Sequence, residues 1–282
     1  MQYFTPRFQI ATLAPPQDRL VSKIGGVPWG LPLDHWPTCC GHPQKLLAQL
    51  CHQPPMLDLG DENAVLHLFQ CLECGGLRPG HRSLATFVLP RSKLDNNPAK
   101  IEGYDYKPAL GEALIGEAFI TGWDESDDGI PEQRLPEFFN EKSLWALQDV
   151  FSEIDWFKGR QRTKFGGSPR WTGNGPLDFP RRPFEFLFQI DCFLHVDGPP
   201  PTPDEVGCPV GKFTDVNAPQ VDRIPAMPRP GMERINAPWS LSYDRANNEF
   251  IFEITNFGSD GTAFVFINRT RRPHQVKWYW NR

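Results

Sequence analysis

The spacing of apolar positions predicts a chain built mainly from short strands. Two runs, Lys45–Leu50 and Val65–Cys71, are apolar at adjacent as well as alternate positions, which is typical of strands buried on both faces of a sheet. Leu84–Leu89 is a third candidate strand. Further along, Glu249–Thr255 and Thr262–Asn268 flank a Gly-Ser-Asp-Gly turn, which is the pattern of a β-hairpin. We therefore expect a sheet whose central strands are covered on both sides.

One segment has helical periodicity instead. Between Glu137 and Phe157, apolar residues recur three and four positions apart, and Gly159 follows. This spacing predicts an amphipathic helix that ends at the glycine. The stretch 91–136 before it is mostly polar and has one strand candidate, Ala113–Thr121. We expect the rest of this stretch to be an exposed connector.

A motif near the start of the chain occurs a second time. KIGGVPW at 23–29 is echoed by KFGGSPRW at 164–171, and each copy is followed by an apolar strand candidate that carries a glutamine, Gln49 or Gln189. From the first glycine of each pair, the glutamine lies 24 positions on in the first copy and 23 in the second. Near-equal spacing of matched motifs indicates an internal duplication.

These patterns together predict one domain of the α+β class, mostly β. We expect internally duplicated antiparallel or mixed sheets, with one main amphipathic helix between the two halves. The pseudo-repeats would cover about 8–100 and about 137–282, and the polar connector 91–136 would join them within the single domain 1–282.

The paired glycines allow two interpretations. Glycines before a proline suit a tight turn with positive φ, and a pseudo-symmetric turn of this kind could hold each half together. Alternatively, Trp29 and Trp171 line a groove between the halves, in which Gln49 and Gln189 present their amides to a guest. The candidate binding residues are Gly25, Gly26, Trp29, Gln49, Gly166, Gly167, Trp171 and Gln189.

Composition and charge narrow the class of protein. The net charge of −5 disfavours a nucleic-acid binder, which usually carries a basic excess. No apolar run approaches the roughly 18 residues of a membrane span, and we expect no signal peptide. Seven cysteines, two of them adjacent, do not form a disulfide framework of the secreted type. We therefore expect a cytoplasmic protein with reduced thiols, no nucleic-acid partner and no membrane contact.

The cysteines give the sharpest chemical signal. Four thiolates satisfy tetrahedral zinc, and a Cys-x-x-Cys knuckle before two glycines has a suitable turn. The candidate ligands are Cys39, Cys40, Cys71 and Cys74. Adjacent cysteines seldom converge on one ion, so His42 or His52 is an alternative to Cys39. Two other interpretations stay open: a redox-active Cys71, and buried thiols that hold no metal.

Several segments resemble a known family. SKIGGVP, LLAQL, HLFQC, KFGGSPRW, FLFQID and FGSDGTAFVFIN together resemble the YwqG-like family of bacteria. This resemblance spans nearly the whole chain and implies a mostly β, α+β fold with internal duplication and no catalytic residues to carry over. The first part is also similar to the eukaryotic programmed cell death protein 2 family. That similarity implies chaperoning of a ribosomal protein through protein contacts, with cysteine clusters that suggest zinc.

No catalytic motif stands out: the sequence has neither a Gly-x-Ser-x-Gly elbow nor a His-Glu-x-x-His pair. We therefore expect a non-enzymatic cytosolic protein that binds a protein or peptide in the groove between its halves, as a chaperone or as an immunity protein against a toxin. The alternative is a small-molecule-binding protein or a hydrolase that uses the same cleft.

Overall fold

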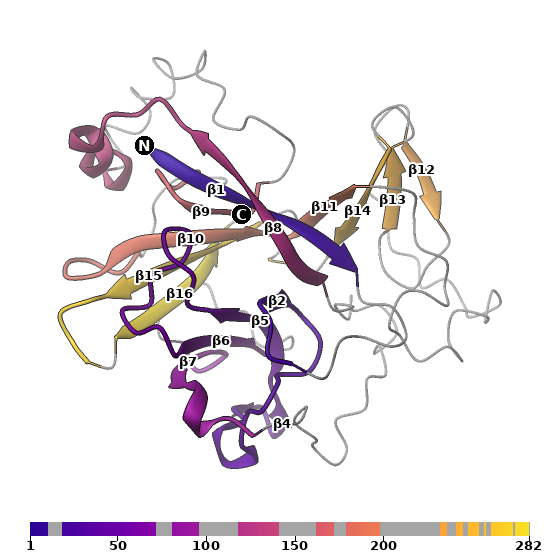
Figure 1. The fold of residues 1–282 in the computed structure, drawn as a ribbon, viewed down its shortest axis with the longest axis vertical. Coiled ribbons are helices and arrows are strands. Elements are labelled where there is room, and N and C mark those ends of the chain that lie inside the picture. Colours follow the sequence, from indigo (N-terminus) through magenta and orange to yellow (C-terminus); the bar gives the residue numbers. More distant parts are fainter. Residues whose placement is uncertain are drawn as a thin grey trace.

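A computed structural model of the chain describes residues 1–10, 19–71, 81–95, 118–140, 162–171, 179–197, 232–235, 241–244, 248–253, 257, 261–272 and 274–281. In this part of the chain, strands form a ten-stranded sheet, a four-stranded sheet and a two-stranded hairpin (Figure 1). Three 3₁₀ helices accompany them: η1 (Leu33–His35), η2 (Arg91–Lys93) and η3 (Glu132–Phe139).

The large sheet has the order β16-β15-β10-β9-β1-β8-β2-β5-β6-β7, and all neighbouring strands are antiparallel. Its strands are β1 (Gln2–Ile10), β2 (Lys23–Ile24), β5 (Lys45–Cys51), β6 (Ala64–Gln70), β7 (Leu84–Pro90), β8 (Ala118–Asp127), β9 (Lys164–Gly166), β10 (Glu185–Asp191), β15 (Thr262–Asn268) and β16 (Gln275–Asn281). The two outer strands contact each other, and the Trp278 Nε1 donates a 3.4 Å hydrogen bond to the Ala85 carbonyl. The sheet is therefore nearly closed on itself.

Two smaller sheets stand beside it. One contains β11 (Phe193–Asp197), β14 (Glu249–Glu253), β13 (Leu241–Asp244) and β12 (Met232–Ile235), in that order. The other is the hairpin of β3 (Thr38–Cys39) and β4 (His42–Pro43).

The strand order is symmetric about the pair β1 and β8. Outward from β8 come β2, β5, β6 and β7, and outward from β1 come β9, β10, β15 and β16. β2, β5, β6 and β7 come from the first half of the sequence, and β9, β10, β15 and β16 come from the second. The first strand of each half, β1 or β8, is the exception, because it lies next to the strands of the other half. β1 pairs with β9, and β8 pairs with β2.

The main core is enclosed by the curved sheet. β15 is buried along its whole length because its even-numbered and odd-numbered side chains both meet other apolar residues. Phe165 and Phe188 stack there, with ring centroids 4.5 Å apart. Burying each such ring contributes roughly 2–3 kcal/mol.

A second, smaller core lies on the outer face of β5, β6 and β7. Leu31 and Trp36, from the segment before β3, pack there against Leu46 and Phe69. β6 is consequently buried on both faces, as the continuous apolar run in its sequence predicted.

The strands expected around 45–50, 65–71, 84–89, 249–255 and 262–268 are confirmed, with shifts of a few residues at some ends. The hairpin expected from the last two is wrong, because β14 pairs with β11 and β13 in the small sheet, whereas β15 pairs with β10 and β16 in the large one. Residues 118–127, most of which we assigned to an exposed connector, form β8 in the middle of the sheet. The acidic residues Asp124, Glu125 and Asp127 lie at the exposed end of this strand, so its composition there resembles that of a loop. The amphipathic helix expected from Glu137 to Phe157 stays a prediction, because η3 ends at Phe139 and 141–161 lie outside the described residues.

Within the described part of the chain, no helix has the length and apolar character needed to cross a membrane.

Candidate functional site

The first Gly-Gly motif forms a corner that a single glutamine holds. Gly25 and Gly26 have φ values of 70° and 71°, in the left-handed region that favours glycine. The amide of Gln49 bridges the two sides of this corner. Its Oε1 accepts a 2.6 Å hydrogen bond from the backbone N–H of Trp29, and its Nε2 donates one of 3.0 Å to the Val21 carbonyl.

The second motif has the same geometry. Gly166 and Gly167 have φ values of 76° and 65°. The Oε1 of Gln189 accepts a 2.9 Å hydrogen bond from the Arg170 N–H, and its Nε2 donates one of 3.1 Å to the Arg162 carbonyl. The two corners therefore share their backbone conformation and both amide contacts.

A hydroxyl completes each corner in the same way. The Ser22 Oγ accepts a 2.9 Å hydrogen bond from the backbone N–H of Cys51, and the Thr163 Oγ1 accepts one of 3.0 Å from that of Asp191. Each accepting residue lies directly before the lysine of its motif.

These contacts favour the structural interpretation of the motif. Gln49 and Gln189 are 0% and 1% exposed, and both ends of each amide contact the chain itself. Trp171 is also buried: its Nε1 donates to the Phe138 carbonyl, and its ring packs 4.5 Å from that of Phe264. Trp29 is half-buried. The structure thus places these residues in two separate turns, at strands β2 and β9, which β1 and β8 separate in the sheet.

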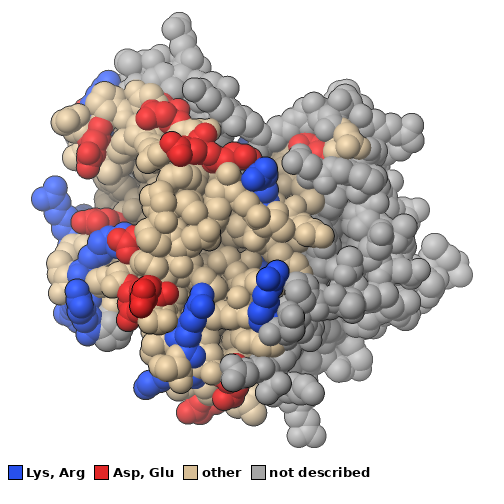
Figure 2. Space-filling view, viewed as in Figure 1, with Lys and Arg blue, Asp and Glu red and all other residues tan. Residues whose placement is uncertain are grey.

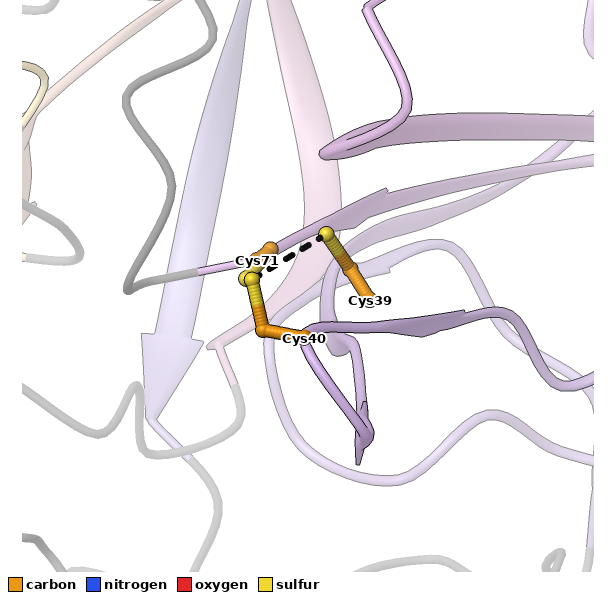
Figure 3. Close-up of side chains that lie close together, drawn as sticks. All are labelled: Cys39, Cys40 and Cys71. Carbon is orange, nitrogen blue, oxygen red and sulfur yellow. Dashed lines mark hydrogen bonds between the residues drawn. The ribbon is translucent and has the colours of Figure 1, made fainter.

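Three of the four candidate metal ligands meet at one place. The Sγ atoms of Cys39, Cys40 and Cys71 all lie within 4.8 Å of one another, and those of Cys39 and Cys40 are 3.8 Å apart (Figure 3). Cys39 and Cys40 come from the β3–β4 hairpin, and Cys71 directly follows β6. Cys74 lies outside the described residues.

The turn of the hairpin explains how two adjacent cysteines converge. Cys40 and Gly41 occupy its central positions with φ values of 54° and 78°. Two successive positive φ values are characteristic of a type I′ turn, whose backbone twist matches that of the flanking strands. In an extended strand, neighbouring side chains point to opposite faces, whereas the left-handed conformation at Cys40 changes the direction of its side chain.

Hydrogen bonds close the base of the hairpin and join it to the segment before β7. The backbone N–H of Gln44 donates a 2.8 Å bond to the Pro37 carbonyl, and the Trp36 Nε1 donates a 3.0 Å bond to the Gln44 carbonyl. The Gln44 side chain reaches the Arg82 carbonyl at 2.8 Å, beside the segment that pairs with Cys71. The three sulfurs are therefore held by two segments that are already joined.

The sulfur spacing suits a tetrahedral thiolate centre. With Zn–S bonds of about 2.3 Å, the edge of a tetrahedron of sulfurs is about 3.8 Å, and the observed Cys39–Cys40 separation is 3.8 Å. Thiolates prefer zinc and softer metal ions over calcium or magnesium. Cys39 and Cys71 are buried and Cys40 is exposed, so an ion here would lie at the edge of the core.

The alternative ligand His52 lies elsewhere. It follows the far end of β5, and its Nδ1 accepts a 2.9 Å hydrogen bond from the backbone N–H of Leu59. The hairpin lies at the opposite end of this strand, roughly 20 Å away for seven extended residues. His52 is therefore excluded as a ligand of this cluster, and the side chain of His42 lies outside the described residues.

The sheet also buries two titratable side chains that are not among the candidate site residues, His67 and Lys164. His67 of β6 is fully buried, and neither ring nitrogen has a hydrogen-bond partner. Burial, followed by the nearby charge of Lys23, lowers the pKa of His67 to about 3. Lys164 is likewise buried, which lowers its pKa to about 8; its Nζ lies 4.8 Å from the centre of the Tyr3 ring.

The sequence signal for these lysines is their position two residues before each Gly-Gly pair. The first residue of each repeated motif pairs across strands with the glutamine of the same corner, Lys23 with Gln49 and Lys164 with Gln189. A lysine next to a polar-looking loop is ordinarily taken as exposed.

The chain matches no protein-family model and no curated protein. The resemblance to the YwqG-like family therefore stays a prediction that depends on the quoted motifs.

Proposed function

We propose that this protein is a non-enzymatic, cytosolic protein-binding protein whose contact surface is held in place by a structural zinc ion. The ligands would be Cys39, Cys40, Cys71 and Cys74. The observation that carries the proposal is the convergence of three sulfurs, from two separate segments, within 4.8 Å. An ion at this point would tie the β3–β4 hairpin to the end of β6 and so fix the layer that covers β5, β6 and β7.

That layer offers a side chain suited to partner contact. Leu33, on η1, is 60% exposed, while Leu31 and Trp36 on either side of it are buried against the sheet. An apolar side chain on a fixed backbone can enter a partner's pocket with little loss of entropy. Trp29 is half-buried on the same segment, four residues before Leu33, and its backbone N–H is held by Gln49 of β5. We propose that Leu33 and Trp29 contact a protein or peptide partner.

Charge supports a protein partner over nucleic acid. The chain carries a net charge of −5, and on the face seen in Figure 2 the described basic and acidic side chains are intermixed. A nucleic-acid surface would show a patch or stripe of basic residues. A role as a chaperone or as an immunity protein against a toxin is compatible with such a surface, and reduced thiols suit the cytosol.

We also propose that the sheet is an internal duplication. The equivalent conformations and hydrogen bonds of the two Gly-Gly corners support it, as does the symmetric strand order about β1 and β8. The repeats would then begin at β1 and at β8, earlier than the boundaries near 8 and 137 that the sequence suggested.

Metal analysis tests the zinc part of the proposal. Protein purified without added metal or chelator is expected to contain zinc at a ratio near one per chain by elemental analysis. Cys71→Ser is expected to lose most of it, whereas Cys192→Ser, a buried cysteine of the other half, is expected to keep it. A ratio near zero in the unaltered protein would overturn this part.

A partner assay tests the binding part. Affinity capture with quantitative mass spectrometry is expected to enrich a protein whose recovery falls at least about tenfold with Leu33→Asp. The matched control Glu62→Lys alters an exposed charge on the β5–β6 loop and should leave recovery unchanged. If no enriched protein depends on Leu33, the proposed contact surface is wrong.

A further inference from the structure

Cys40 differs from the other cysteines of its cluster in exposure and in backbone conformation. It is exposed, whereas Cys39 and Cys71 are buried, and its φ of 54° lies in the left-handed region that residues other than glycine rarely adopt. At this turn position asparagine, aspartate or glycine is ordinarily preferred. A cysteine held there costs on the order of 1 kcal/mol of conformational strain. The turn presents this one sulfur to solvent beside two that are shielded.

We propose that Cys40 is an oxidant-reactive modification site, which peroxide converts to a sulfenic acid and the Cys71 thiol then resolves to a disulfide. In the first step the Cys40 sulfur attacks a peroxide oxygen, the O–O bond breaks, and water leaves. In the second step the Cys71 sulfur attacks the sulfenic sulfur, an S–S bond forms, and a second water leaves. Peroxide is the oxidant, and it takes up the two electrons that the thiols lose.

The geometry favours this pair of sulfurs. All three Sγ atoms lie within 4.8 Å of one another, so a shift of the hairpin tip of a few ångströms brings either partner to the S–S bond length of about 2.05 Å. A disulfide between the adjacent Cys39 and Cys40 would close a small, strained ring. Cys71 lies on a separate segment and has no such constraint. The inference deepens the proposed function, on which its consequence rests, because oxidised sulfurs cannot hold the ion.

Cys51 provides a matched comparison within the chain. It is buried at the far end of β5, and desolvation raises the pKa of its thiol, so it is expected to react slowly with peroxide. Cys51→Ala therefore serves as the control for Cys40→Ser.

The test is peroxide treatment of the full chain, both as purified and after chelator treatment, followed by thiol counting and peptide mapping by mass spectrometry. We expect a Cys40–Cys71 disulfide in the unaltered protein and in Cys51→Ala. In Cys40→Ser, thiol loss should be at least about tenfold slower. In Cys71→Ser, a sulfenic acid at Cys40 should be trapped by dimedone. Circular dichroism of each variant checks that it is folded.

Two outcomes would overturn the inference: equal thiol loss in Cys40→Ser and the unaltered protein, or a product that lacks the Cys40–Cys71 linkage. The metal measurement is made before peroxide is added, so the two proposals can fail separately. A disulfide in a protein that never held zinc would support this inference and contradict the metal centre. A zinc protein in which Cys40 stays reduced, even after chelation, would do the reverse.

Discussion

His67 makes the stability of this protein sensitive to mild acid. Its ring is 0% exposed and faces Lys23 of β2 through Gln49, its cross-strand partner on β5, with Phe87 of β7 on the other side. Burial and then the Lys23 charge lower its pKa from 6.5 to about 3. The perturbation we suggest is His67→Leu, which keeps a similar volume and removes the titrating group.

The magnitude follows from proton linkage. Because the folded-state pKa is lowered, the unfolded chain binds the proton first, and stability falls as the pH drops below 6.5 toward about 3. At pH 5 the difference in protonation corresponds to a loss of about 2 kcal/mol relative to pH 7.5, at about 1.4 kcal/mol per pH unit. This loss should be absent in His67→Leu.

The assay is urea unfolding at pH 7.5, 6.0 and 5.0, with the free energy of unfolding compared between the unaltered protein and His67→Leu. His81→Gln is the control, because His81 is exposed. Carboxylates that titrate near pH 5 contribute equally to all three proteins, so the difference between proteins isolates His67. If the unaltered protein and His67→Leu lose the same stability between pH 7.5 and pH 5.0, the linkage argument is refuted.

Three further predictions concern turns, corners and metal. Gly30→Ala should lower the free energy of unfolding by at least about 3 kcal/mol, because the added Cβ would lie 2.1 Å from a backbone oxygen. Gly41→Ala has open space around its Cβ and should lower it by only about 1 kcal/mol. Equal urea midpoints for the two variants would contradict this prediction. Gln49→Leu and Gln189→Leu should each lower the free energy of unfolding by about 2–3 kcal/mol, because each leaves a backbone N–H and a carbonyl without a hydrogen bond. The two losses should add in the double variant. A loss in only one of the two variants would show that the corners are not equivalent. Chelation should lower the melting temperature of the unaltered protein but not that of Cys71→Ser, and an equal shift in both would argue against a metal at the cluster.

Much of the sheet could be predicted because its strands have a distinctive composition. β6 carries apolar residues on both of its faces, because the main core covers one face and the layer that contains Trp36 covers the other. The Gly-Gly corners could be found because their spacing to Gln49 and Gln189 is nearly constant, and the structural role that we weighed for them matches the hydrogen bonds observed.

What could not be predicted depends on pairing between distant segments. β8 is a central strand although residues 124–127 resemble a loop, because its place is set by β1 and β2, which lie about a hundred residues earlier in the chain. The convergence of Cys39 with Cys40 depends on one positive φ at Cys40, and residue type alone does not indicate it. The burial of Lys164 likewise follows from its pairing with Gln189 on β10.

The exchange of leading strands has a consequence for how this molecule holds together. β1 completes the edge of β9, and β8 completes the edge of β2, so each half lends a strand and receives one in return. Either half on its own would have one sheet edge and one strand without a pairing partner. Two copies of that half could supply the missing pairings to each other by exchanging the same strand. The two halves of the chain therefore cannot separate without breaking three strand pairings at once, β1 with β8, β1 with β9 and β2 with β8.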